Sequence, residues 1–275
     1  IAIGDQAVSS GTDSFAIGTD TDATGTSSLA IGKGAQATAN YNLAIGLNAN
    51  ATAERAIAIG NNGVIAGSTY STAIGHNSGF GGSTTATGSG ATALGGSYAS
   101  GVDSFAAAIV NNTSSYGATG AYSIAIGKLA KATGEGAIAI GRDTVASGDD
   151  AFAVGERNEA TDHNAVAMGF DSVASANFAI AMGYQAAASG NNSVAIGTSI
   201  TASAIQATSI GGENNTASGT RATALGGSTN YATGQESYAF GNRASAKEVG
   251  KHSYSGYFGF SGTFAGGFGV GGSQG

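Results

Sequence analysis

The residues that could take part in catalysis are few and lie far apart in the sequence. His76, His163 and His252 are scattered along the chain, and none of them stands beside a candidate nucleophile or a pair of carboxylates. Asp149 and Asp150 are adjacent, but their polar surroundings are typical of a solvated turn rather than of a catalytic dyad. The chain has no Cys, which excludes a cysteine nucleophile, a thiolate metal site and a disulfide. We therefore expect no catalytic residues and no enzymatic activity.

Two further segments were considered as metal or cofactor sites. Asp13, Asp20 and Asp22 lie close together and could suggest Ca²⁺, but the nonapeptide pattern of calcium-binding rolls is absent. The Gly-rich segment GGSTTATGSG (81–90) lacks the GK[ST] sequence and the following helix of a phosphate-binding loop. The sequence therefore predicts no metal and no cofactor.

The elements that position these residues follow an internal repeat of 14 residues, in which a Gly ends an apolar segment such as AIAIG. One series of these glycines is Gly4, Gly18, Gly32, Gly46 and Gly60, and a second is Gly127, Gly141, Gly155, Gly169, Gly183, Gly197 and Gly211. A fixed period over so many copies is the signature of a solenoid, in which each repeat is one coil that packs on its neighbours.

The first strand of each repeat ends at this Gly. Bulky apolar residues stand one and three positions before the Gly, with an Ala between them, so the bulky pair faces one way and the Ala the other. Apolar residues on both faces predict a strand that is buried on both sides. The bulky column next to the Gly, which we expect to form the core of an assembly, consists of Ile17, Ile31, Ile45, Ile59, Ile126, Ile140, Val154, Met168, Met182, Ile196 and Ile210.

The second half of the repeat predicts a first turn, a second strand and a second turn. Two mostly polar residues follow the Gly, and Ala then recurs at alternate positions around a polar residue, as in Ala35, Gln36 and Ala37. This pattern predicts a short strand with small residues inside and polar residues outside. A column of Ser or Thr follows before the second turn. A regular column of hydroxyls could order water and bind ice, but hydroxyls that hydrogen-bond along the stack or to the turn backbone explain it better.

One repeat is thus a coil of two short strands and two tight turns, and the predicted fold class is an all-β parallel β-roll. The interior of the coil is lined by Ala, Ser and Gly, so the bulky column points away from it. Repetition makes an apolar stripe far larger than the few hundred square ångströms that soluble monomers usually expose, roughly 300–600 Å². Identical chains that pack these stripes around an axis would bury them. We therefore expect a homotrimer or a similar assembly.

Three segments carry a resemblance to a known family: SFAIG (14–18), YSIAIGKLAKATGEGAIAIG (122–141) and NSVAIG (192–197). They resemble the head repeats of YadA-like trimeric autotransporter adhesins. The resemblance implies a left-handed roll, a homotrimer, and display at the cell surface from the outer membrane. It also implies a role in adhesion and virulence, with an extracellular matrix protein or a cell-surface receptor as partner. A trimeric phage or tailocin tail fibre, or an extracellular filament segment, is the alternative.

The repeat divides the chain into four segments. Regular repeats are expected in residues 1–75 and 122–249, and irregular repeats with insertions in 76–121. Residues 250–275, rich in Gly and aromatic residues, are expected to form a cap or the start of a further domain.

The irregular segment and the C-terminal segment supply the candidate ligand contacts, because loops on a rigid scaffold often carry function. These candidates are Tyr98, Tyr116, Tyr254, Tyr257 and Phe258. Ten Lys and Arg against 17 Asp and Glu give a net charge of −7, which argues against a nucleic acid partner. No apolar run approaches the roughly 18 residues of a membrane span, so this segment is not expected to insert into a membrane.

Overall fold

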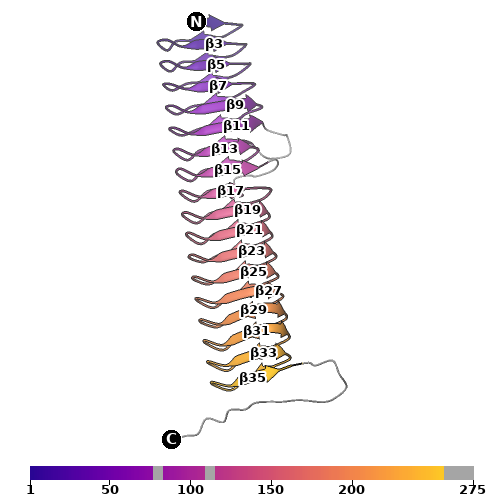
Figure 1. Ribbon diagram of the computed structural model, residues 1–275. Coiled ribbons are helices and arrows are strands. Elements are labelled where there is room, and N and C mark those ends of the chain that lie inside the picture. The colour runs from indigo at the N-terminus through magenta and orange to yellow at the C-terminus, as the bar shows by residue number, and fades with distance from the viewer. Residues whose placement is uncertain (77–82, 109–114, 257–275) are drawn as a thin grey trace. The chain divides into compact units, whose positions relative to one another are not determined.

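The structure, a computed structural model of the 275-residue chain, describes residues 1–76, 83–108 and 115–256. It divides into two compact units, Ile1–Ala146 (unit 1) and Ser147–Gly275 (unit 2). In the described residues each unit consists of short strands and tight turns without a helix, and odd-numbered and even-numbered strands alternate along the chain. Figure 1 labels odd-numbered strands. The odd-numbered strands are the first strands of the repeats, and the even-numbered strands are the second strands.

Unit 1 is a stack of coils in which each first strand pairs only with first strands. Its first strands are β1 (Ala2–Ile3), β3 (Phe15–Ile17), β5 (Leu29–Ile31), β7 (Leu43–Ile45), β9 (Ile57–Asn61), β11 (Thr72–His76), β13 (Thr92–Gly95), β15 (Phe105–Ala108), β17 (Ile124–Ile126) and β19 (Ile138–Arg142). Its second strands are β2 (Val8–Ser9), β4 (Asp22–Ala23), β6 (Gln36–Ala37), β8 (Asn50–Ala51), β10 (Ile65–Ala66), β12 (Thr85–Ala86), β14 (Tyr98–Ala99), β16 (Gly117–Ala118), β18 (Lys131–Ala132) and β20 (Val145–Ala146). Each pairing is parallel and in register, as where Ala16 pairs with Ala30.

Unit 2 has the same construction. Its first strands are β21 (Phe152–Glu156), β23 (Val166–Phe170), β25 (Ile180–Tyr184), β27 (Val194–Thr198), β29 (Thr208–Glu213), β31 (Thr223–Ser228), β33 (Tyr238–Asn242) and β35 (His252–Ser255). Its second strands are β22 (Glu159–Ala160), β24 (Val173–Ala174), β26 (Ala187–Ala188), β28 (Thr201–Ala202), β30 (Thr216–Ala217), β32 (Tyr231–Ala232) and β34 (Ser245–Ala246). The pairings are again parallel, as between Ala167 and Ala181. The predicted all-β parallel solenoid with a repeat of about 14 residues is therefore confirmed.

The interior of each coil is made almost entirely of small side chains. Ala16 on β3 and Ala23 on β4 have no exposed surface, and the Ala residues at the same positions of the other coils are buried in the same way. Because both strands contribute Ala, the two sheets of a unit lie close together and the core is thin. The alternation of Ala with larger residues thus determines which face of each strand is buried, and the small size of Ala keeps the two sheets close together.

In most coils a Gly stands at or near the end of the first strand, although Ala108 and Ser255 take its place in β15 and β35. Backbone geometry favours Gly at this position. Gly46 has φ +126°, which L side chains rarely adopt, and a Cβ on it would overlap the carbonyl oxygen of Gly60 in the next coil. The chain therefore turns out of the first strand with its backbone against that of its neighbour. This close approach explains why the repeat keeps Gly where its other positions vary.

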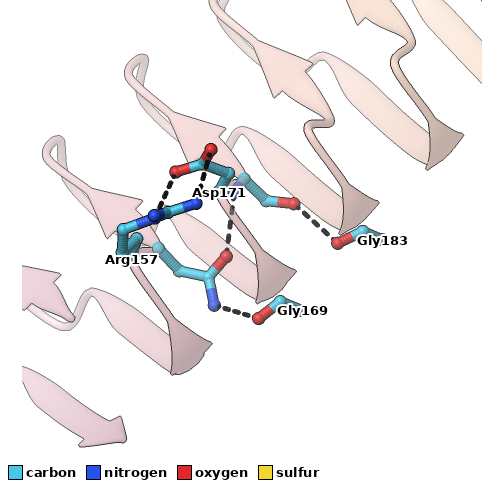
Figure 2. Close-up of polar contacts among 6 residues, drawn as sticks. Arg157, Gly169, Asp171 and Gly183 are labelled. Atoms are coloured by element: carbon cyan, nitrogen blue, oxygen red, sulfur yellow. Dashed lines mark hydrogen bonds and ion pairs between the residues drawn. The ribbon is translucent and has the colours of Figure 1, made fainter. Parts of the chain in front are cut away.

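Polar side chains near the first turn bind the backbone of neighbouring coils (Figure 2). In unit 2, Nδ2 of the buried Asn158 donates to the carbonyl oxygen of Gly169 at 2.6 Å. Oδ1 of Asn158 accepts a hydrogen bond from the N–H of Ser172 at 2.9 Å, and the Ser172 hydroxyl donates to the Gly183 oxygen at 3.0 Å. These bonds link the polar side chains of one coil to the backbone of the next.

The segment with irregular spacing continues the stack of unit 1 with coils of unequal length. Thr72 pairs with Thr92, Thr92 with Phe105, and Phe105 with Ile124, so successive coils contain 20, 13 and 19 residues. The extra residues fall between a first strand and the following second strand, where residues 77–82 and 109–114 lie outside the described part of the chain. The strands on either side keep their pairing. This is expected, because the entropy cost of closing a surface loop rises only slowly with its length.

Candidate functional site

The most extensive candidate surface is the outward face of the first strands. The eleven residues of the predicted core column occupy this face, six in unit 1 and five in unit 2, and each of them is half-buried or exposed. Ile17 is 38% exposed, Ile126 36% and Ile210 37%. In the single chain, therefore, the Ala face of each first strand is buried and the bulky face is not, as expected for a column that points away from the interior of its own coil.

The second bulky column, three positions before the Gly, lies on the same face. It includes Phe15, which is 42% exposed, and the half-buried Leu29 and Leu43. We call the two columns together the apolar stripe of each unit. Along the stripe, neighbouring residues are in register, as Ile31 is with Ile45 and Met168 with Met182.

At the last described coils of unit 2 the stripe becomes aromatic. The rings of Tyr238 on β33 and His252 on β35 stack with centroids 4.7 Å apart, and those of Phe240 and Tyr254 with centroids 5.5 Å apart. Tyr238, Phe240 and Tyr254 are between 45% and 53% exposed. The stacks place Tyr254, one of the predicted ligand contacts, within the stripe rather than on a loop.

The outward face of the second strands is more polar. Its outward column begins each second strand and carries Asp22, Gln36, Asn50, Lys131 and Glu159 among its members. Its apolar members, such as Val145 and Val173, alternate with these polar residues along the stack. Of the two outward faces of a unit, only that of the first strands is apolar in nearly every coil.

The other predicted ligand contacts are not gathered into one site. Tyr98 begins β14 and Tyr116 directly precedes β16, in neighbouring coils of unit 1, and both are half-buried. Tyr254 belongs to unit 2. Tyr257 and Phe258 lie outside the described residues.

A stack of side chains on the second turns of unit 1 was missed by the sequence reasoning. The guanidinium of Arg55 lies between two tyrosine rings, with Cζ 5.2 Å from the centroid of Tyr41 and 5.4 Å from that of Tyr70. Nη1 of Arg55 donates to the Tyr70 hydroxyl at 2.9 Å and lies 3.0 Å from Oε1 of Glu54. Their spacing of about one repeat, from Tyr41 to Arg55 to Tyr70, is the signal that could have predicted the stack.

A comparable stack lies on the first turns of unit 2. Arg157 forms a two-point ion pair with Asp171, with Nε 3.0 Å from Oδ1 and Nη2 3.2 Å from Oδ2 (Figure 2). Its Cζ lies 4.4 Å from the ring centroid of Phe170, and that ring stacks on Tyr184 at 5.2 Å. Successive coils thus align like positions closely enough for side chains one repeat apart to interact.

The groups first considered for chemistry remain on the surface. His163 lies 3.7 Å from Asp149, and both side chains are about half exposed. Over residues 1–76, 83–108 and 115–256, no three His, Asp or Glu side chains are grouped closely enough to hold a metal ion. The same residues contain no helix that is long and apolar enough to cross a membrane.

The coils match a known repeat. A family model described as the YadA head domain repeat, in two copies, matches residues 1–21, 23–41, 43–62, 118–144, 146–172, 174–199 and 232–252, which together are more than half of the chain. A search of curated proteins found no match. The matched segments include all three that carried the resemblance in the sequence, which is thereby confirmed. The chain belongs to the YadA head domain repeat family.

Proposed function

We propose that this chain is the head of a homotrimeric adhesin, displayed at the cell surface from the outer membrane. Membership of the YadA head family implies an adhesin-like role. The observation that carries the trimer is the apolar stripe, because bulky side chains recur on one outward face in coil after coil while the interior holds mostly small residues. Three identical stripes that meet around an axis remove this surface from water.

Attachment would be multivalent and would require no catalysis. In a homotrimer each exposed turn occurs three times around the axis, so weak contacts at the turns add up to strong attachment. An extracellular matrix protein or a cell-surface receptor is the proposed partner. The exposed turns, together with the longer coils between residues 76 and 121, are the proposed contact region.

Two pairs of substitutions in unit 2 test the role of the stripe. Met168→Lys with Met182→Lys places charges in the stripe, and Val173→Lys with Ala187→Lys places the same charges on the outward face of the second strands. All four residues are half-buried in the single chain. We expect the first pair to turn a trimer into monomers in analytical ultracentrifugation, because six Lys would have to be desolvated at the axis. The second pair should leave the trimer intact.

The adhesive role is tested with the same proteins in solution, without attachment to beads. The protein with the second pair should be retained by matrix-coated surfaces or fixed cells at least about tenfold more than the protein with the first, since only the trimer binds multivalently. Equal retention of the two would contradict multivalent adhesion. Equal masses of the two in solution would contradict the stripe as the trimer interface, whatever their retention.

A further inference from the structure

The second turns of unit 1 form a ladder that can be followed residue by residue. Its members are Ser27, Tyr41, Arg55, Tyr70, Gly90, Asp103 and Tyr122, which have φ values between +50° and +69°. From Tyr41 onward, the backbone N–H of each member donates to a carbonyl oxygen of the preceding coil, in the residue that directly precedes the earlier member. Gly90 N–H thus donates to the Thr69 oxygen at 3.0 Å, and Asp103 N–H to the Ser89 oxygen at 2.8 Å. Consecutive members therefore occupy neighbouring coils, about 4.8 Å apart.

Apolar burial does not explain the tyrosines of this ladder, although Arg55 stacks on two of them, Tyr41 and Tyr70. Left-handed φ values are unfavourable for bulky side chains, whereas the Asp and Asn at the same position elsewhere, such as Asp13 and Asn192, tolerate them. Tyr70 and Tyr122 are 57% and 58% exposed, so little apolar burial offsets this cost. Strained, exposed aromatic residues are better explained by binding than by packing.

Two short residues separate Tyr70 from Tyr122. Gly90 has no side chain, and the space that its Cβ would take is occupied by Oδ1 of Asp103, so the carboxylate lies over Gly90. The step from Tyr70 to Tyr122 spans three coils, or about 14 Å. Between its two tyrosines the ladder thus has two positions without a bulky side chain, which we call the gap, and the Asp103 carboxylate lies at the first of them.

The molecule itself shows what fits beside such a tyrosine. One coil before Tyr70, the Arg55 guanidinium lies over the tyrosine ring and is paired with the Glu54 carboxylate. One coil after Tyr70, the gap offers a ring and a carboxylate with no cation of its own at the Gly90 position. We propose that Tyr70, Gly90, Asp103 and Tyr122 form a notch that binds an arginine side chain of a partner protein.

The charges around the notch favour such a partner. The chain has a net charge of −7, which attracts a basic segment. The nearest cation on the ladder, Arg55, is paired with Glu54 at 3.0 Å and so repels an incoming guanidinium less. Guanidinium groups combine cation–π stacking with two-point binding of a carboxylate, which a Lys ammonium does less well.

The notch is tested with the peptide acetyl-Gly-Arg-Gly-amide, followed by ¹⁹F NMR of the chain labelled with 3-fluorotyrosine. The Tyr70 and Tyr122 resonances, assigned with Tyr→Phe variants, should shift in a saturable way. The same peptide with citrulline, which has the shape of Arg without its charge, should bind at least about fivefold more weakly. Equal shifts with both peptides would overturn the proposal.

Matched variants locate the site. Asp103→Asn keeps a residue that accepts φ +50°, removes the charge, and should weaken binding about fivefold. Asp13→Asn removes the same charge from another coil. The next member of the ladder there is Ser27 and not a tyrosine, so this variant should bind the peptide as the unmodified chain does. Equal losses in the two variants would show that binding follows general charge and would overturn the notch.

Arg55→Gly should open a second notch between Tyr41 and Tyr70 and bring the Tyr41 resonance into the titration.

The proposal deepens the adhesive role and rests on it for its biological meaning, but the two fail separately. Peptide binding is a property of one chain and does not require a trimer. A trimer that attaches to surfaces and ignores the arginine peptide would overturn the notch alone. A chain that binds the peptide through Asp103 but stays monomeric would overturn the proposed function alone.

Discussion

The interior of a coil and the outward face of its first strand follow different rules, although they belong to the same short segment of chain. Within β19, Ala139 has no exposed surface, and its neighbours Ile138 and Ile140 are half-buried on the other face. The Ala positions of the interior are specified by size, because only small side chains fit where the two strands of a coil face each other. The outward face is specified by hydrophobicity alone, because no other segment of the described chain packs on it. The Ala face packs inside the coil, and the bulky apolar face is available to pack against other chains.

The largest expected effect comes from enlarging a side chain of the interior. Ala139→Leu should lower the free energy of unfolding by about 3 kcal/mol or more, because the extra carbons meet close-packed backbone and Ala side chains on every side. Ile140→Leu, which places the same side chain on the outward face without a change of volume, should cost less than about 1.5 kcal/mol. Denaturant unfolding of the two variants checks the difference. Comparable losses would show that the interior is not size-limited.

A smaller effect is expected from the polar part of the interior. Nδ2 of the buried Asn230 donates to the oxygens of Gly226 at 2.8 Å and Gly241 at 2.7 Å, and its Oδ1 accepts from Ala244 N–H at 2.9 Å. Asn230→Ala should cost about 2–3 kcal/mol, because buried backbone groups lose their partners. Tyr231→Thr, one residue later on the outward face of β32, is the control and should cost clearly less in thermal unfolding.

The smallest effect is expected at the exposed turns. Arg157 is about half exposed, and its ion pair with Asp171 and its contact with Phe170 stabilise the fold only modestly. Arg157→Ala should therefore lower the free energy of unfolding by about 0.5 kcal/mol, and added salt should reduce the difference. If the loss exceeded that of Asn230→Ala, the ranking of interior over surface would be wrong.

The 14-residue period and the alternation of bulky residues with Ala were enough to predict the strands, their parallel pairing and the small interior. The period aligns like positions of successive coils, and alternation then decides which side chains turn inward. The outward direction of Ile17 and its column also followed from this alternation, but an apolar residue does not reveal which chain covers it, so the burial of the column in an assembly stays a prediction.

The sequence revealed less about the turns. The buried position near the first turn accepts Thr21, Val64, Asn158 and Ile200, so no single residue type marks it. The stack of Tyr41, Arg55 and Tyr70 depends on contacts between coils that a column-by-column comparison of residue types does not consider. The predicted contacts Tyr98 and Tyr116 were chosen for their irregular surroundings, whereas the exposed aromatic residues of the ladder lie in regular turns.

The central claim, that the apolar stripe is buried between identical chains, is tested most directly by the mass of the unmodified protein in solution. Light scattering at low concentration should give a mass near three times the 26.3 kDa of one chain. A mass of 26.3 kDa that persists as the concentration rises would mean that the stripe stays exposed to water, and it would contradict the account.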